Sequence, residues 1–310
     1  MRDCGAVLAA LTLLSACALP SVDPLNLPAD VAANIPPDID MSEVNRDTHG
    51  CYFYTYGASL FTVEDENGDP VCRPDIVATR QTSWDIQFAE PFDFSADVSM
   101  IDLDAEFTPA ADVAQLVARG IEPICYVSIG TWESYRGDAA QFPVPVLGKI
   151  WPDWPDERYL DIRQIDTLRP LMRARFAICA AKGFVGVEAD NQDLHWADSG
   201  FEISRADQIA YSREMAQLAH DMGLTFGQKN SPDIVADLID TADFIVTEAC
   251  FDAGWCDDVL GYRAADKPVY AIEYTDTAVT FAAACAYGDR HDISFILKDR
   301  DLNAARQTCP

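Results

Sequence analysis

The chain has 310 residues, enough for one large domain, and an α/β barrel of roughly 250 residues would nearly fill it. Its 51 acidic residues outnumber 22 basic ones, and no stretch gathers lysine and arginine into a patch for phosphate backbones. The length excludes a second full-sized domain, and the net charge of −29 argues against a nucleic-acid partner.

The N-terminus has the pattern of an export signal. Arg2 precedes an apolar run at positions 6–14 that is too short to span a membrane. Leu14-Ser15-Ala16-Cys17 resembles a bacterial lipobox, in which Cys17 takes a lipid and becomes the mature N-terminus. The alternative is an ordinary signal peptide, cut after Ala16 or Ala18. We therefore expect an extracytoplasmic protein: a cell-envelope lipoprotein anchored to the membrane, or a secreted one.

The cysteines predict disulfides. Of the ten, Cys4 leaves with the signal and Cys17 takes the lipid, and the others are disulfide candidates in an exported protein. The candidate pairs are Cys51 with Cys72, Cys250 with Cys256, and Cys285 with Cys309. Cys125 lies in a strand-like run and Cys179 in a helical one, which also fits buried free thiols, so their pairing stays open. The four histidines are scattered, and we expect no metal and no other cofactor.

Three segments follow from composition: a signal and lipobox at 1–17, a tether and N-terminal extension at 18–80, and a barrel domain at 81–310. Residues 18 to about 47 are rich in Pro, Asp, Ala and Asn without periodicity, which is typical of a tether. Residues 65–70 have part of the spacing of a calcium loop, but Ile76 occupies the place of its last glutamate. A disulfide-closed hairpin with a turn at Asn67-Gly68 is the better interpretation.

From residue 80 onward, strand-like runs alternate with amphipathic helical ones, the pattern of a parallel sheet. The eight runs are Thr82 to Phe88, Ser99 to Asp104, Glu122 to Ser128, Phe184 to Asp190, Thr225 to Lys229, Phe244 to Glu248, Val269 to Tyr274 and Ile293 to Lys298. Helices are expected at 109–119 and 205–222. Eight runs predict a (β/α)8 TIM barrel, with the long aromatic insertion at 129–165 on the face where barrel active sites lie.

Two carboxylates each end one of these runs. Asp190 follows the apolar run that begins at Gly183, and Glu248 follows the run that begins at Asp243. A charge directly after four or five core residues is costly to hold unless it faces a cleft, and glycoside hydrolysis needs two carboxylates across a sugar bond. A glycosidase is therefore the first hypothesis.

Other polar residues collect at the ends of the runs, and in a barrel these ends converge on one mouth. They are Gln87, Asp102, Asp104, Tyr126, Ser128, Glu188, Asn191, Lys229, Asn230, Glu273 and Tyr274. A single acidic strand end is often only a helix N-cap, but here seven of the eight ends carry polar groups.

From Trp84 to about Lys298 the chain resembles glycoside hydrolase family 114, the endo-α-1,4-polygalactosaminidases. The segments that carry the resemblance are 84–87, 125–130 with Glu133 and Arg136, 154–155 leading to 159–163, 183–191, 229–230, 248–250 with Cys256, and 267–274. These segments occur in the same order as in the family, and together they span about two thirds of the chain. The sequence departs from the family at Ala189, where proline is usual, and at Tyr159, where tryptophan is usual.

The resemblance implies a (β/α)8 barrel that hydrolyses α-1,4-linked galactosamine polymers, with Asp190 and Glu248 as the catalytic carboxylates. It also implies retention of configuration, with Asp190 as the nucleophile and Glu248 as the acid/base. In a retaining enzyme the two carboxyl groups should lie about 5 to 5.5 Å apart, against about 6.5 to 9.5 Å in an inverting one.

A cationic, partly deacetylated galactosamine chain would suit the acidic charge balance, and sugar faces stack on aromatic rings. We predict substrate binding by Gln87, Asp102, Asp104, Tyr126, Glu188, Asn191, Lys229, Asn230, Glu273, Tyr274, Trp132 and Trp154. The alternative is structural: the acids would orient Asp190, Lys229 and Asn230 through hydrogen bonds, and the tryptophans would only pack.

Two other functions stay open at this point. One is a non-catalytic carbohydrate-binding surface lipoprotein on the same scaffold, and the other is a barrel hydrolase that acts on a different glycan. The presence of both carboxylates favours an active enzyme, which we expect to be a monomer. Fold alone does not separate these functions.

Overall fold

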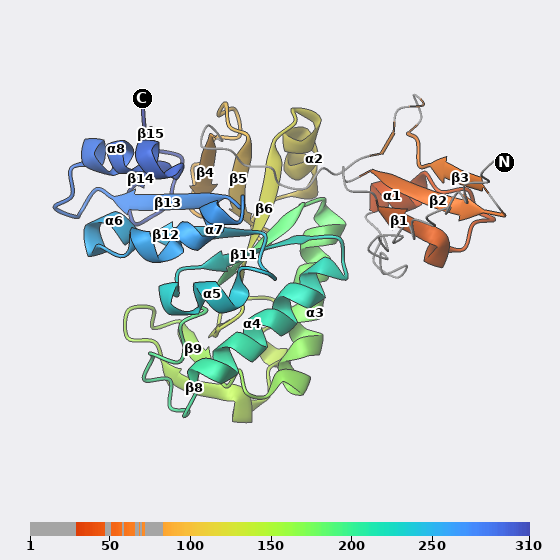
Figure 1. Ribbon diagram of the computed structural model, residues 1–310. Helices are drawn as coiled ribbons and strands as arrows, with labels where there is room; N and C mark the ends of the chain where they lie inside the picture. The colour runs from red at the N-terminus through yellow and green to blue at the C-terminus, as the bar shows by residue number, and fades with distance from the viewer. Residues whose placement is uncertain (1–28, 47–50, 58, 66–67, 69, 72–82) are drawn as a thin grey trace, which may run out of the picture.

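The computed structural model describes residues 29–46, 51–57, 59–65, 68, 70–71 and 83–310 (Figure 1). Eight strands in residues 83–310 pair in parallel and in chain order. They are β4 (Trp84–Gln87), β5 (Met100–Asp104), β6 (Glu122–Ser128), β10 (Gly186–Asp190), β11 (Thr225–Lys229), β12 (Phe244–Glu248), β13 (Val269–Tyr274) and β14 (Ser294–Lys298). Each coincides with a predicted run, so the predicted TIM-barrel fold is confirmed.

The sheet curls until its first and last parallel strands meet. The Trp84 indole nitrogen donates to the Ser294 carbonyl at 3.1 Å. Lys298 on β14 and Asp85 on β4 form an ion pair at 2.9 Å, and both side chains are completely buried. The Asp85 carboxylate also accepts hydrogen bonds from the Ile86 amide and the Gln87 side chain. A salt bridge therefore closes the barrel, and β15 (Gln307–Thr308) adds to β14 in the antiparallel sense.

Replacing Lys298 with methionine is expected to lower the free energy of unfolding by about 3–5 kcal/mol, because the buried Asp85 carboxylate loses its nearest counter-ion and keeps the more distant Arg306, at 3.9 Å. The double variant Lys298→Met with Asp85→Asn should recover part of this loss, since no uncompensated charge remains. Urea unfolding of the three proteins measures both effects. Equal losses in the single and double variants would show that packing, and not charge pairing, closes the barrel.

Successive residues of each strand point to opposite sides of the sheet, and the two sides build two apolar layers. Inside the barrel lie Trp84, Ile86, Met100, Ile124, Val246 and Ile272. Residues of the opposite parity, such as Ile101 and Leu103, pack against the surrounding helices. Met100 and Asp102 on β5 share the inner side, and the same alternation determines which strand-end residues face the cleft.

Helices follow most of the strands on the outside of the barrel (Figure 1). They are α2 (Ala110–Ala118), α3 (Ile165–Lys182), α4 (Arg205–His220), α5 (Val235–Leu238), α6 (Cys250–Ala253), α7 (Leu260–Ala264) and α8 (Phe281–His291). Short 3-10 turns occur at Met41–Glu43, Ala139–Gln141, Val144–Val146, Pro232–Ile234 and Cys256–Val259. The predicted helices at 109–119 and 205–222 correspond to α2 and α4. Ser204 and Asp207 form a capping box that fixes the start of α4.

The insertion between β6 and α3 folds into a small antiparallel sheet of its own. Its strands are β7 (Thr131–Glu133), β8 (Leu147–Ile150) and β9 (Glu157–Leu160), in the order β7-β9-β8. The sheet starts directly after the C-terminal end of β6, on the predicted face of the barrel. A separate cluster near the N-terminus contains α1 (Ala29–Ala33), β1 (Val44–Arg46), β2 (Tyr52–Tyr56) and β3 (Ser59–Thr62) around its own small core.

Disulfides join Cys250 to Cys256 and Cys285 to Cys309, as predicted. Cys125 and Cys179 are also bonded to each other and are not free thiols, because β6 and α3 pack with these two side chains in contact. The predicted Cys51–Cys72 pair, the Asn67-Gly68 turn and the lipobox cysteine Cys17 involve residues outside the described ranges. Disulfides fit an extracytoplasmic compartment. Within the described ranges, no helix has the length and apolar character needed to cross a bilayer.

Candidate active site

A cleft of about 820 Å³ opens at the C-terminal ends of the barrel strands. Its floor carries residues that end β10, β11, β12 and β13, among them Asp190, Lys229 and Glu248. One wall comes from the insertion, through residues including Trp154 and Glu157, and another from residues 300–303 after β14. The strand ends, the insertion and the C-terminal segment thus build one site.

Lys229 is the charged centre of this site. Its ammonium nitrogen lies 2.8 Å from Glu188, 3.2 Å from Asp190 and 3.4 Å from Glu248. Burial would lower the pKa of Lys229, but the three carboxylates outweigh it and raise the pKa well above its usual value. Asp190 and Glu248 remain 19% and 29% exposed, so both can be reached from the cleft. Because both bind the same nitrogen, their nearest oxygens cannot be further apart than the sum of the two contact distances.

Three successive strands end in a charged side chain that lines the cleft, and each is followed by a residue in the left-handed conformation. Asn191 (φ 63°) follows Asp190, Asn230 (φ 47°) follows Lys229, and Ala249 (φ 53°) follows Glu248. Asparagine adopts this conformation more easily than most residues. The sharp turn at each strand end keeps the preceding side chain at the mouth of the barrel and leads the chain away from it.

Glu248 receives several hydrogen bonds that favour its ionised form. Tyr274 donates its hydroxyl proton to one carboxylate oxygen, and Asn230 donates its amide proton to the other at 3.2 Å. The Asn230 side-chain oxygen accepts the Glu248 backbone N–H at 2.8 Å, which fixes both residues. Burial would raise the pKa of Glu248, but Lys229 and these donors outweigh it and lower the pKa. The Arg300 guanidinium stacks on the Tyr274 ring at 3.7 Å.

Two further carboxyl groups, Asp102 and Glu188, lie below the cleft and are fully buried inside the barrel. Burial, aided by Glu188, raises the pKa of Asp102 well above its usual value, and neither Asp102 oxygen has a hydrogen-bond partner within the described part of the chain. Burial is also the main cause that raises the pKa of Glu188 to about 7, although Lys229 opposes it. Burial therefore shifts both groups toward their protonated forms, and Lys229 partly opposes this shift.

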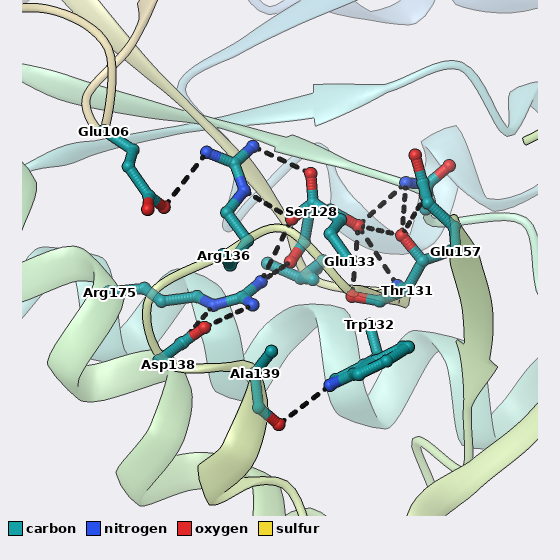
Figure 2. Close-up of polar contacts among 12 residues, drawn as sticks. Glu106, Ser128, Thr131, Trp132, Glu133, Arg136, Asp138, Ala139, Glu157 and Arg175 are labelled. Atoms are coloured by element: carbon teal, nitrogen blue, oxygen red, sulfur yellow. Dashed lines mark hydrogen bonds and ion pairs between the residues drawn. The ribbon is translucent and has the colours of Figure 1, made fainter.

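A ladder of buried ion pairs supports the insertion side of the site (Figure 2). Arg136 pairs with Asp104 at 2.7 Å and with Glu133 at 2.7 Å, and Arg175 on α3 pairs with Asp138 at 2.7 Å. The Glu133 side chain is completely buried between the two arginines. This ladder ties the end of β5 and the start of the insertion to α3, which makes that wall of the cleft rigid.

The predicted binding residues fall into two groups. Those that line the cleft are Asp104, Tyr126, Asn191, Lys229, Asn230, Tyr274 and Trp154, together with Asp190 and Glu248. Five do not line it. Asp102 and Glu188 lie deeper, and Gln87 is bound to Asp85 and to the backbone of Asp93.

The other two predicted residues outside the cleft lining have structural contacts. Glu273 points away from the barrel axis and accepts the backbone N–H groups of Phe251 and Asp252 in α6, at 2.9 and 3.3 Å. Trp132 packs on the outer core, and its indole donates to the Ala139 carbonyl at 2.9 Å (Figure 2). The Trp132 contacts match the packing role given as its alternative, whereas the Glu273 contacts with the backbone of α6 fit neither interpretation.

Several lining residues were not predicted to act, notably Glu157 and Arg300. Glu157 lies on β9 and Arg300 follows β14, so neither ends a barrel strand, and the rule used for prediction could not find them. To find them, one would first have to know which segments outside the barrel strands pack against the mouth of the barrel. Among the described residues, no group of His, Cys, Asp and Glu side chains is arranged to hold a metal ion.

Asp190 and Glu248, which both contact Lys229 at the mouth of the barrel, fit the pair of carboxyl groups that glycoside hydrolysis needs. Comparison with known families supports this class directly. The model of glycoside hydrolase family GH114 matches residues 69–310, and the chain belongs to this family. It is therefore a glycosidase.

Solved structures agree with this assignment. The crystal structure of Aspergillus fumigatus Ega3 in complex with galactosamine aligns with this chain at 30% sequence identity and a TM-score of 0.71. The alignment covers 75% of this chain and 97% of the Ega3 chain. The glycoside hydrolase domain of PelA from Pseudomonas aeruginosa aligns at 16% sequence identity and a TM-score of 0.59. This alignment covers 73% of this chain and 98% of the PelA domain. At this identity PelA shows the shared fold alone. No curated protein matches the chain.

Proposed function

We propose that this glycosidase hydrolyses α-1,4-linked, galactosamine-containing polysaccharide, with Asp190 and Glu248 as its catalytic carboxylates. The observation that carries the proposal is their shared contact with Lys229 at the floor of an acidic cleft. The similarity to a structure described as a complex with galactosamine supports the substrate class. Asp104, Asp193 and Glu157 also line the cleft, and carboxyl groups suit a sugar that carries an ammonium group.

The contacts of the two acids favour Glu248 as the nucleophile and Asp190 as the acid/base, the reverse of the roles that the resemblance implies. Glu248 accepts from Tyr274, Asn230 and Lys229, whereas among the residues that the structure describes the Asp190 side chain accepts from Lys229 alone. A nucleophile must be ionised before the reaction starts, and a general acid must carry a proton. Their binding to one nitrogen is more compatible with the short separation of a retaining enzyme than with the range of about 6.5–9.5 Å for inversion.

The test is to incubate the protein with deacetylated α-1,4-polygalactosamine and to follow the size and anomeric configuration of the products. We expect shorter cationic oligosaccharides that first appear with retained configuration. N-acetylated polygalactosamine and polyglucosamine (chitosan) should be tested in parallel. Cleavage of chitosan alone would contradict the substrate class, and absence of cleavage with all three polymers would contradict the activity.

We further propose that residues 1–17 are a signal and lipobox, that 18–80 form a tether and extension, and that 81–310 form the catalytic unit. The family match at 69–310 supports the last boundary approximately. Lipid attached at Cys17 would place a monomeric enzyme at the cell envelope. Metabolic labelling with a fatty acid tests this, because Cys17→Ser should abolish the label and move the protein out of the membrane fraction. Equal labelling of both proteins would contradict the anchor.

A further inference from the structure

Glu273 is a buried acid that the proposed chemistry does not use. It precedes Tyr274 at the end of β13, it is completely buried, and it does not line the cleft. Its two carboxylate oxygens accept the backbone N–H groups of Phe251 at 2.9 Å and Asp252 at 3.3 Å. These N–H groups belong to the first turn of α6, where a helix has no backbone acceptors of its own for them. Glu273 therefore supplies, from a neighbouring strand, the acceptors that this turn needs.

The residue before α6 cannot supply these acceptors itself. Ala249 occupies the capping position, where it has no side-chain oxygen and lies in the left-handed conformation at φ 53°. Serine, threonine, asparagine and aspartate are the usual residues at this position, because their side chains accept such an N–H group. The Cys250–Cys256 disulfide ties α6 to the segment that follows it and not to a barrel strand. Glu273 on β13 thus takes the place of the missing cap.

Glu248 directly precedes this turn, and β13 contacts both of them. The Ala249 backbone N–H donates to the Ile272 carbonyl of β13 at 2.7 Å. The Glu248 carboxylate accepts the hydroxyl proton of Tyr274, the residue next to Glu273. Because successive residues of a strand point to opposite sides of the sheet, Tyr274 reaches Glu248 from the cleft side and Glu273 reaches the turn from the helix side. The end of β13 therefore holds Glu248 and the backbone that follows it.

We propose that Glu273 is a positioning residue for Glu248: by holding the start of α6, it fixes the turn at Ala249 and keeps the Glu248 carboxylate aligned in the cleft. The inference rests on the proposed catalytic role of Glu248, whether this acid is the nucleophile or the acid/base. A displacement of about 1 Å at a reacting group can cost about a hundredfold in rate. Since Glu273 does not line the cleft, its loss acts on the reaction step and leaves substrate binding in place.

The activity test compares kcat and KM of the wild type, Glu273→Met and Glu273→Gln on polygalactosamine. Methionine has a similar length but accepts neither N–H group, so we expect kcat to fall about tenfold to a hundredfold while KM changes less than about threefold. Glutamine keeps one oxygen acceptor, and its kcat loss should be less than about fivefold. A rise in KM at unchanged kcat, or equal kcat losses in both variants, would overturn the proposal.

The Glu248→Ala background tests whether the effect passes through Glu248. This variant, assayed with azide, lacks the carboxylate that Glu273 is proposed to align. Adding Glu273→Met should therefore lower the azide-dependent rate by less than about threefold, because the two substitutions are not additive when one acts through the other. A further loss as large as that in the wild-type background would overturn the proposal, since Glu273 would then act on the site by another route.

Asp243 offers a matched control on the same strand as Glu248. It directly precedes β12, at the opposite end from Glu248, and accepts the Phe226 backbone N–H at 2.8 Å. Asp243→Leu also removes an acceptor of a backbone N–H, but at a residue that does not line the cleft. It should lower stability and leave kcat of the folded protein within about threefold of the wild type. A kcat loss equal to that of Glu273→Met would overturn the proposal, because it would show a general effect of destabilisation.

Hydrogen exchange of individual backbone amides, followed by NMR, tests the inference without enzyme activity. In Glu273→Met the two α6 amides that Glu273 binds lose their acceptors. If Glu273 also fixes the preceding turn, the Glu248 and Ala249 amides should exchange about tenfold faster than in the wild type, or more. Faster exchange at the two α6 amides alone would overturn the proposal. This readout needs no substrate, so it decides the inference even if the protein hydrolyses none of the polymers and the proposed function fails.

Discussion

Replacing Glu248 or Asp190 with alanine is expected to reduce hydrolysis of polygalactosamine by about a thousandfold or more, because each step of a two-carboxylate mechanism then lacks its nucleophile or its proton donor. The loss should appear in kcat, since both groups act on the reacting bond and not on distant sugar units. Initial rates of reducing-end release measure it. Retention of more than a tenth of the wild-type rate in either variant would remove that residue from the catalytic pair.

Azide distinguishes the two roles. If Glu248 is the nucleophile, azide should rescue Glu248→Ala with a glycosyl azide of inverted configuration and Asp190→Ala with one of retained configuration. The opposite pattern would restore the roles that the family resemblance implies. Asp240→Asn is the control, because this acid is exposed and lies outside the cleft lining. It should change the rate by less than about threefold.

Replacing Lys229 with methionine is the second change with a large expected effect, on activity and on stability together. The variant leaves Glu188, Asp190 and Glu248 without the ammonium group that binds all three. We expect a loss of about 3–5 kcal/mol in the free energy of unfolding at pH 7, as for other broken buried ion pairs. Glu248 would no longer be held ionised, so kcat should fall by about a hundredfold or more.

The pH dependence of this stability loss identifies its cause. A lowered pKa contributes stability that is present above the unfolded value of about 4.3 and is lost as pH falls. The cost of Lys229→Met should therefore shrink as pH falls from about 4.3 through the lower folded pKa of Glu248, because the Glu248 carboxyl group then becomes protonated in both proteins. Lys267→Met is the matched control, since Lys267 donates to the backbone carbonyls of Ile239 and Ala242. Its cost should not vary with pH, and a similar trend in both variants would contradict the charge argument.

The barrel could be predicted because each strand has a run of apolar residues and each connection has a recognisable helix or loop. The positions of Asp190, Lys229 and Glu248 followed from one rule, that the C-terminal ends of parallel strands meet at one mouth. The Cys250–Cys256 pair followed from its short spacing. These are local properties of the chain, and the structure preserves them.

The side chains that sequence alone could not place depend on which face of a strand a residue occupies. Glu273 and Tyr274 are neighbours on β13, yet Tyr274 reaches Glu248 while Glu273 turns outward to α6. A difference of one residue exchanges cleft and helix layer. Glu157 and Trp132 depend on the tertiary position of the insertion, and the Cys125–Cys179 bond depends on how α3 packs against β6. None of these is encoded by spacing.

The segment after β14 links the integrity of the barrel to the shape of its cleft. Residues 300–303 line the cleft, Asn303 accepts a hydrogen bond from the same Lys298 that pairs with Asp85, and Arg306 donates to the Trp84 carbonyl at 2.5 Å. The Cys285–Cys309 disulfide then secures the end of this segment to α8. Loss of the last ten residues would therefore remove a wall of the binding site and part of the closure between β4 and β14 in a single event. We therefore expect removal of these residues to lower stability and activity together.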